Sequence, residues 1–300
     1  MQAWIWITCG AALAQTLRFM LQKHLATGVL SASGATFARF VYSAPIVALF
    51  VYLYARQSGQ DVPSIHAGFA GYALMGGLAQ ILATICTVAL FSMRNFAVGI
   101  TLKKTEVLQT AIVGFVLLGE RLSGITILGI LIGFAAVMFL SDTGGGVAAK
   151  LLRRPDKTAA LGLLSGALFG ISGISYRAAS LSLDSGDTAI RAGLTLAFVT
   201  AAQTLIMVGW FLWQDRAQIK KVFASWRVSA LVGLTSMVGS YCWFSAFTLQ
   251  KAALVNAVGQ IELAFSLVAS TLIFGEKITI RELIGIGLLM VSILIIVLAL

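Results

Sequence analysis

The sequence predicts an all-α membrane protein in which ten transmembrane helices form two inverted five-helix repeats. Hydrophobic residues make up 59% of the 300 residues and charged residues only 11%, which is far below the charged share of a soluble domain. The apolar segments are continuous and do not alternate in polarity, so they indicate helices and not the strands of a β-barrel. The second half of the chain also repeats the pattern of the first half.

Each expected helix has a length near the roughly 20 residues that an α-helix needs to cross a bilayer. Five helices precede a Gly-rich, charged stretch and five follow it. We therefore expect a first repeat at 1–141, a cytoplasmic linker at 142–157 and a second repeat at 158–300. The expected helices cover residues 4–23, 31–54, 67–91, 95–118, 123–141, 158–181, 186–213, 225–249, 252–275 and 279–300.

The basic residues lie mainly in every other connection between the expected helices. Under the positive-inside rule the odd-numbered connections are cytoplasmic, which places both termini on the outer side. The net charge of +10 therefore reflects topology, and without a basic tail or an aromatic-interleaved patch it does not indicate a nucleic-acid partner. The odd-numbered connections hold Lys23, Arg94, Lys150, Arg153, Arg154, Lys157, Arg216, Lys220, Lys221, Arg227, Lys277 and Arg281, and the even-numbered ones hold Arg56, Arg121 and Lys251.

The repeat becomes visible when the chain is aligned with itself at an offset of 156 residues. Glu106 then matches Glu262, and both lie near the middle of their expected helices. At an offset of 152 residues, Arg39 matches Arg191. Because five is an odd number, the second repeat crosses the membrane in the opposite direction to the first. Inverted repeats of this kind are typical of secondary transporters, whose substrate sites lie at the midplane between the two repeats.

Two motifs in the repeats resemble those of the drug/metabolite transporter superfamily, specifically its EamA-type transporters. They are GERL at 119–122 and GEKI at 275–278, each of which follows a helix with a mid-span glutamate. The resemblance covers nearly the whole chain and implies two EamA domains, export of a small molecule and a place in the bacterial inner membrane. The family usually has Glu-Pro where this chain has Glu106-Val107 and Glu262-Leu263. The Lys103-Lys104 pair is similar instead to basic pairs in the phosphate-ester branch of the superfamily.

Four cationic side chains are expected at a similar depth in the membrane, namely Arg18, Arg39, Lys103 and Lys104. Insertion of a charged residue at the centre of a membrane helix costs about 2.5–3.5 kcal/mol. We therefore interpret the group as lining a water-filled entrance that attracts a carboxylate or a phosphate from the cytosol. The alternative is that these side chains extend to lipid headgroups and that Arg39 pairs with a neighbour.

The two mid-span glutamates admit two interpretations. Glu106 and Glu262 could bind an ammonium group or exchange a proton, because burial and mutual repulsion favour the protonated form of a carboxylic acid. The alternative is an ion pair between Glu106 and Lys103, which lie three residues apart on one helix face. That pair alone leaves Lys104 and Glu262 unexplained.

Further polar and aromatic residues are expected to line the same pocket. The first helix carries a polar stripe at Gln15, Arg18 and Gln22, and aromatic rings could contact an apolar or cationic part of a substrate. The alternative is hydrogen bonding between helices and an aromatic belt at the membrane interface. The predicted substrate-binding or coupling residues are Gln15, Arg18, Arg39, Thr84, Lys103, Lys104, Glu106, Arg191, Ser240, Tyr241, Trp243 and Glu262.

The sequence carries no signature of an enzyme, a metal site or a cofactor site, such as a P-loop or a metal-ligand cluster. Charges of both signs along one route instead predict a transporter of a small polar metabolite, an amino acid or a related zwitterion, that works by alternating access. One alternative is an exchanger of phosphorylated or other anionic metabolites that uses Lys103 and Lys104 as phosphate ligands. Another, from a different class, is a membrane channel or scaffold. The expected partners are the substrate, protons and the lipid bilayer, with the chain as a monomer or a homodimer.

Overall fold

The computed structural model describes residues 3–91, 93, 102–141, 157–265, 268 and 280–299. The described residues are helical apart from short connections, and none of them forms a β-strand. The predicted all-α class is therefore confirmed. Most of the linker expected at 142–157 lies outside the described residues.

Helices fill both halves of the chain, and their ends carry recognisable caps. The Ser31 hydroxyl accepts the Gly34 N–H at the start of α2, and Gly59 and Gly119 end α2 and α5 with a φ of 64°. The first half contains α1 (Ala3–Gly28), α2 (Ala32–Ser58), α3 (Ala67–Leu90), α5 (Glu106–Leu118) and α6 (Gly124–Ser141). The second half contains α8 (Lys157–Ser182), α9 (Thr188–Gln214), α10 (Arg216–Ala224), α11 (Trp226–Leu249), α12 (Ala252–Gly259) and α14 (Ile280–Leu298).

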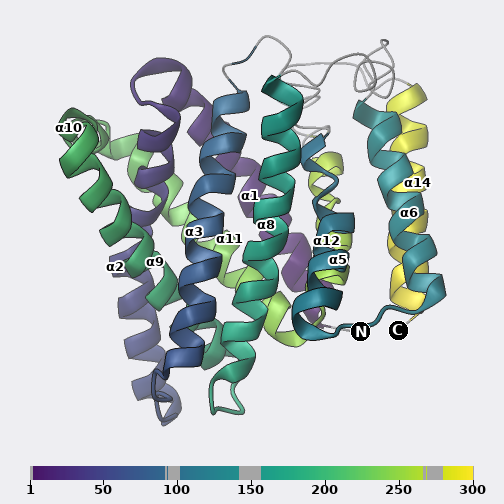
Figure 1. The fold of residues 1–300 in the computed structure, drawn as a ribbon, viewed down its shortest axis with the longest axis horizontal. Helices are drawn as coiled ribbons and strands as arrows, with labels where there is room; N and C mark the ends of the chain where they lie inside the picture. Colours follow the sequence, from purple (N-terminus) through teal and green to yellow (C-terminus); the bar gives the residue numbers. More distant parts are fainter. Residues whose placement is uncertain are drawn as a thin grey trace.

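The contacts between helices follow a pseudo-two-fold arrangement of the two halves. The sequence repeat pairs α1 with α8, α2 with α9, α3 with α11 and α6 with α14. The most extensive contacts, α3 with α8 and α1 with α11, are exchanged by this pairing, while the contacts of α2 with α9 and α6 with α14 map onto themselves. In Figure 1, α1 begins at the lower edge and α8 at the upper edge, so the two halves run in opposite directions.

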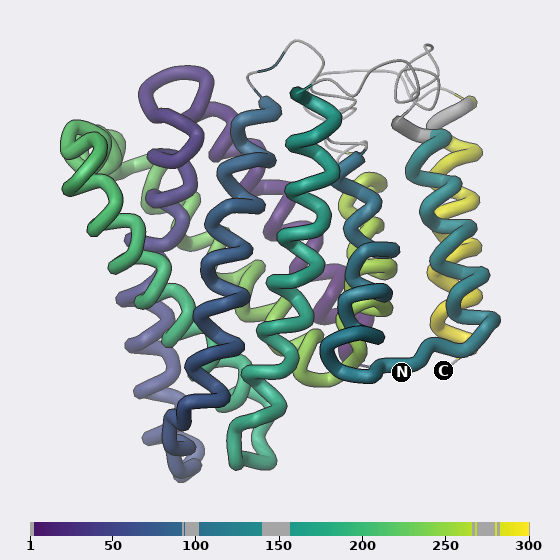
Figure 2. The backbone as a smooth tube through the Cα atoms, viewed as in Figure 1, coloured from purple at the N-terminus to yellow at the C-terminus, as the bar shows by residue number. Residues whose placement is uncertain are grey.

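Five described helices are long and apolar enough to cross a membrane, namely α2, α3, α8, α9 and α11. Shorter apolar helices cover Glu106–Leu118, Gly124–Phe139, Ala252–Phe265 and Leu283–Leu298. The chain is thus a multi-pass membrane protein, and the count of ten crossings stays a prediction. Figure 2 shows the start of α1 and the end of α14 at the same edge of the bundle, as an even number of crossings requires.

Two of the expected helices are interrupted, and the interruptions lie at equivalent positions of the two halves. The α-helical backbone is broken at residues 104–105, before α5, and at residues 260–261, after α12. The backbone N–H of Thr105 bonds to the carbonyl of Leu102 at 3.1 Å, three residues back where an α-helix would bond four back. This tighter 3₁₀ geometry often marks functional hinges.

The helices expected at 95–118 and 252–275 are therefore each interrupted within the described residues. The second break has the same 3₁₀ geometry as the first, because the Ile261 N–H bonds to the Val258 carbonyl at 3.1 Å. Each break lies immediately before a glutamate, Glu106 or Glu262. Neither break contains proline, the residue that usually marks an interrupted helix in a sequence.

A short amphipathic helix, α10, lies outside the expected spans. Asp215 caps it by accepting the Ala217 N–H at 3.1 Å, and Gln218 and Val222 are its buried residues. The basic side chains of α10 are exposed. The segment lies in a connection between expected helices, and nine residues are too few for a membrane span.

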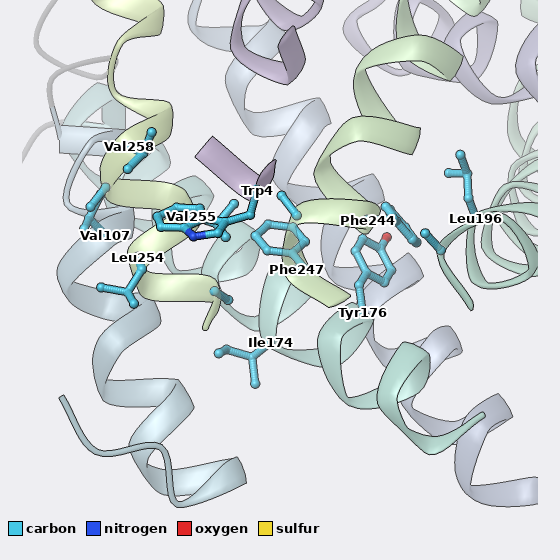
Figure 3. Packing of buried hydrophobic residues seen from close by; sticks show 14 of the residues in the cluster. Trp4, Val107, Ile174, Tyr176, Leu196, Phe244, Phe247, Leu254, Val255 and Val258 are labelled. Carbon is cyan, nitrogen blue, oxygen red and sulfur yellow. The ribbon is translucent and has the colours of Figure 1, made fainter. Parts of the chain in front are cut away.

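The apolar core continues into the region between the two breaks. Figure 3 shows Trp4 beside Val255, and Tyr176 against Phe244. The rings of Tyr176 and Phe244 stack with centroids 4.2 Å apart, and Phe247 belongs to the same cluster of buried residues. These residues come from α1, α8, α11 and α12, so the cluster joins both halves of the chain.

Small residues on α8 and α6 allow close helix packing. A Cβ atom added at Gly166 would lie 2.8 Å from the carbonyl oxygen of Lys103. On α6, a Cβ atom added at Gly133 would lie 2.5 Å from the Ser292 hydroxyl of α14. The close approach at Gly166 holds the first helix break against α8.

Candidate functional site

A cavity lies between the two halves at the level of the two helix breaks. Its volume is about 50 Å³, which is space for roughly four water molecules. Residues of α1, α2, α3, α5, α8, α11 and α12 line it together with the segments around both breaks. Eight of the predicted site residues are in the lining: Gln15, Arg39, Lys103, Lys104, Glu106, Ser240, Trp243 and Glu262.

The Arg39 guanidinium is held in the cavity wall entirely by hydroxyl groups. Its Nε donates to Ser236 Oγ at 2.8 Å, its Nη1 to Thr84 Oγ1 at 3.1 Å and its Nη2 to Ser240 Oγ at 3.1 Å. The Arg39 side chain is only 4% exposed. No carboxylate lies within ion-pair distance of it in the described part of the chain. The hydroxyls therefore orient the guanidinium without neutralising it, and one N–H on each Nη remains for a ligand.

The two lysines at the first break form ion pairs with the two mid-span glutamates. Lys103 Nζ lies 3.7 Å from Glu106 Oε2 within the first half. Lys104 Nζ lies 3.2 Å from Glu262 Oε2, so this pair joins the two halves. The predicted pairing of Lys103 with Glu106 is thus present, and Lys104 and Glu262, which that pairing left unexplained, bind each other.

The polar stripe of α1 extends this network away from the cavity. Gln15 Nε2 donates to Glu262 Oε2 at 3.0 Å, while Gln15 Oε1 accepts from Arg18 Nη2 at 3.3 Å. Arg18 Nη1 also donates to Gln22 Oε1 at 3.2 Å. The Arg18 side chain is 2% exposed and lies behind the cavity lining, over the ring of Phe19. Gln15 therefore connects a second buried guanidinium to the Lys104–Glu262 pair.

Aromatic rings cover the opposite part of the wall. Trp243 stacks on Phe247 with ring centroids 5.6 Å apart, and Gly259 leaves room for the Trp243 ring because an added Cβ would lie 2.4 Å from it. Lys103 Nζ lies 4.8 Å from the ring centroid of Phe169, within cation–π range. The Trp243 Nε1 is buried and has no hydrogen-bond partner among the described residues.

Some predicted residues lie outside the lining. Thr84 instead accepts a hydrogen bond from Arg39, and Arg18 donates one to Gln15. Tyr241 packs edge-on against Phe50 at 5.1 Å. Arg191 lies in the first turns of α9, where its N–H bonds to the Asp187 carbonyl, and the structure does not bring its side chain to the cavity. The arginines matched by the repeat therefore occupy different environments.

Several lining residues were not selected from the sequence. Two of them, Asn256 and Gln260, are buried polar residues near the second break, and Asn256 Nδ2 donates to Thr110 Oγ1 at 3.0 Å. The buried phenol of Tyr176 and the ring of Phe169 come from α8. The repeat signal could have indicated Gln260, because it is the equivalent of Lys104. No three metal-ligating side chains come together within the described ranges.

Comparison with known families decides the general identity of the chain. The model of the EamA-like transporter family matches residues 2–142 and 156–298, one match in each half. The chain belongs to the EamA-like transporter family. As an EamA member it is a membrane transporter of small molecules.

One solved structure, titled "Crystal structure of protein", resembles the EamA chain in its fold. That similarity covers 99% of this chain and 96% of the other, with a TM-score of 0.72 and 14% sequence identity. At this identity the likeness concerns the fold alone. A comparison with curated proteins finds no matching sequence.

Proposed function

We propose that the chain is a secondary transporter that exports a small polar metabolite, an amino acid or a related zwitterion, across the bacterial inner membrane. The observation that carries this proposal is the Arg39 guanidinium, buried in the cavity wall without a carboxylate partner among the described residues. Its two remaining Nη N–H groups suit the two oxygens of a substrate carboxylate.

The ammonium group of the substrate would bind at Glu106 or Glu262. Both carboxylates line the cavity, and each already contacts a primary ammonium group, that of Lys103 or Lys104. A substrate ammonium could replace a lysine ammonium at either carboxylate without a change in the kind of contact. Exchange of a proton at the same carboxylates would couple transport to a proton gradient.

Alternating access is supported by the symmetry of the site. The breaks at 104–105 and 260–261 are equivalent in the repeat, and discontinuous helices at a repeat interface are characteristic of transporter binding sites. The Lys104–Glu262 pair joins the two halves at this level. Rocking of one half against the other would expose the cavity to each side in turn.

The exchanger of phosphorylated metabolites is the second candidate, and the positive charge of the lining favours it. Its predicted phosphate ligands, Lys103 and Lys104, are both engaged by glutamates, so a phosphate would have to displace two ion pairs. A channel or scaffold would have no use for oriented charges in a cavity of about 50 Å³. For these reasons we favour the amino-acid transporter.

The test is uptake by purified protein in proteoliposomes that are preloaded with unlabelled amino acids. We expect saturable exchange of radiolabelled amino acid that an excess of unlabelled substrate abolishes. Trans-acceleration by organic phosphates and by no amino acid would support the phosphate exchanger instead. An ohmic current without saturation would support a channel and overturn the proposal.

A further inference from the structure

The cavity and the network behind it carry an excess of positive charge. The two lysines are neutralised by the two glutamates in the ion pairs described above. The guanidinium groups of Arg18 and Arg39 are at most 4% exposed, and neither has an ion pair within the described part of the chain. The excess is therefore two positive charges, and protonation of either glutamate would increase it.

Neutral partners cannot remove this excess. Arg39 is held by hydroxyl groups and Arg18 by the amide oxygens of Gln15 and Gln22, which stabilise the guanidinium groups through hydrogen bonds but carry no opposite charge. Buried charges without a counter-charge cost several kcal/mol inside a membrane protein. An anionic ligand in the cavity would supply the missing charge.

We propose that the cavity selects small substrates with two carboxylate groups, namely acidic amino acids and short dicarboxylic acids, over neutral zwitterions. This inference rests on the transport function proposed above. A neutral amino acid leaves the excess charge unchanged, because its carboxylate and its ammonium group cancel each other. An acidic amino acid reduces the excess by one charge, and a dicarboxylic acid without an amino group reduces it by two.

The cavity wall has enough hydrogen-bond donors for two carboxylate groups. Arg39 offers one free N–H on each Nη, and the Trp243 Nε1–H has no hydrogen-bond partner among the described residues. Both residues line the cavity.

The experiment compares aspartate with asparagine, which have nearly the same shape and differ by one charge. Proteoliposomes with the full chain take up each labelled amino acid in counterflow, with succinate and a short phosphate ester as competitors. We expect aspartate and succinate to compete at concentrations at least tenfold lower than asparagine. Arg39→Gln should reduce the ratio of aspartate to asparagine uptake, whereas Arg39→Lys, which keeps the charge, should retain more of that ratio.

The wild-type ratio alone decides the inference, so a folding defect in an Arg39 variant leaves the test intact. Equal competition by aspartate and asparagine would overturn the selection for two carboxylates and leave amino-acid transport standing. Strongest competition by the phosphate ester would also overturn it, in favour of the anion exchanger. Absence of transport for every amino acid and dicarboxylic acid would overturn the proposed function together with this inference.

Discussion

Removing one member of the Lys104–Glu262 pair should destabilise the protein strongly, whereas removing both should cost much less. The two charged atoms lie 3.2 Å apart, and their side chains are 5% and 13% exposed. At an effective dielectric constant of about 20, unit charges at this distance attract each other by about 5 kcal/mol before desolvation is counted. Because the remaining charge would stay buried, Lys104→Met or Glu262→Gln alone should lower the free energy of unfolding by about 3–5 kcal/mol.

The assay is a double-mutant cycle in mixed micelles, with unfolding by a denaturing detergent followed by circular dichroism. The double variant should lose less stability than the sum of the single variants, with a coupling energy of about 2 kcal/mol or more. Lys220→Met is the control, because Lys220 is exposed on α10 and its replacement should change stability by no more than about 0.5 kcal/mol. Additivity of the two single effects within about 0.5 kcal/mol would refute an energetic link between the halves at this pair.

Three further predictions concern coupling, substrate binding and packing. Glu106→Gln should abolish transport or shift its pH dependence, and identical uptake by variant and wild type between about pH 5 and pH 8 would exclude a role in proton coupling. Ser236→Ala removes the 2.8 Å bond to Arg39 Nε and should weaken substrate binding by about 1.5–3 kcal/mol in a titration of purified protein; unchanged affinity would count against Arg39 as the carboxylate ligand. Gly133→Leu should destabilise the α6–α14 contact by about 1–3 kcal/mol in thermal unfolding. Gly209→Leu is the control, because a Cβ atom added there meets nothing within 4 Å. Equal effects of the two substitutions would contradict the packing argument.

The helical class and the position of the charged residues could be predicted because both depend on properties of the sequence alone. Continuous apolar segments indicate helices in a bilayer, and the cost of intramembrane charge identifies Arg39, Glu106 and Glu262 as residues that need partners or a function. The repeat also indicated which segments of the two halves are equivalent, and the two breaks lie at equivalent positions. It did not predict that Arg191 and Arg39 would differ in environment, since equivalent positions can face different neighbours.

The contacts that cross between the two halves could not be predicted, because they depend on how the halves pack together. Ser236 and Ser240 reach Arg39 only through the packing of α11 against α2. The Lys104–Glu262 pair likewise depends on how the two breaks face each other. Neither contact can be detected in the hydropathy of the chain or in the spacing of its charged residues. The sequence also lacks proline at the breaks, so the usual sign of an interrupted helix was missing.

Residues 104–105 and 260–261 contain no proline, so both interruptions keep their backbone N–H groups. A proline would remove a backbone donor permanently, whereas Thr105 and Ile261 keep their N–H groups and can exchange a bond to the third residue back for one to the fourth. Conversion between these two patterns changes the winding of the helix and so turns the adjacent carboxylate about the helix axis. We expect such a rewinding to release or recapture a lysine without unfolding the helix that follows.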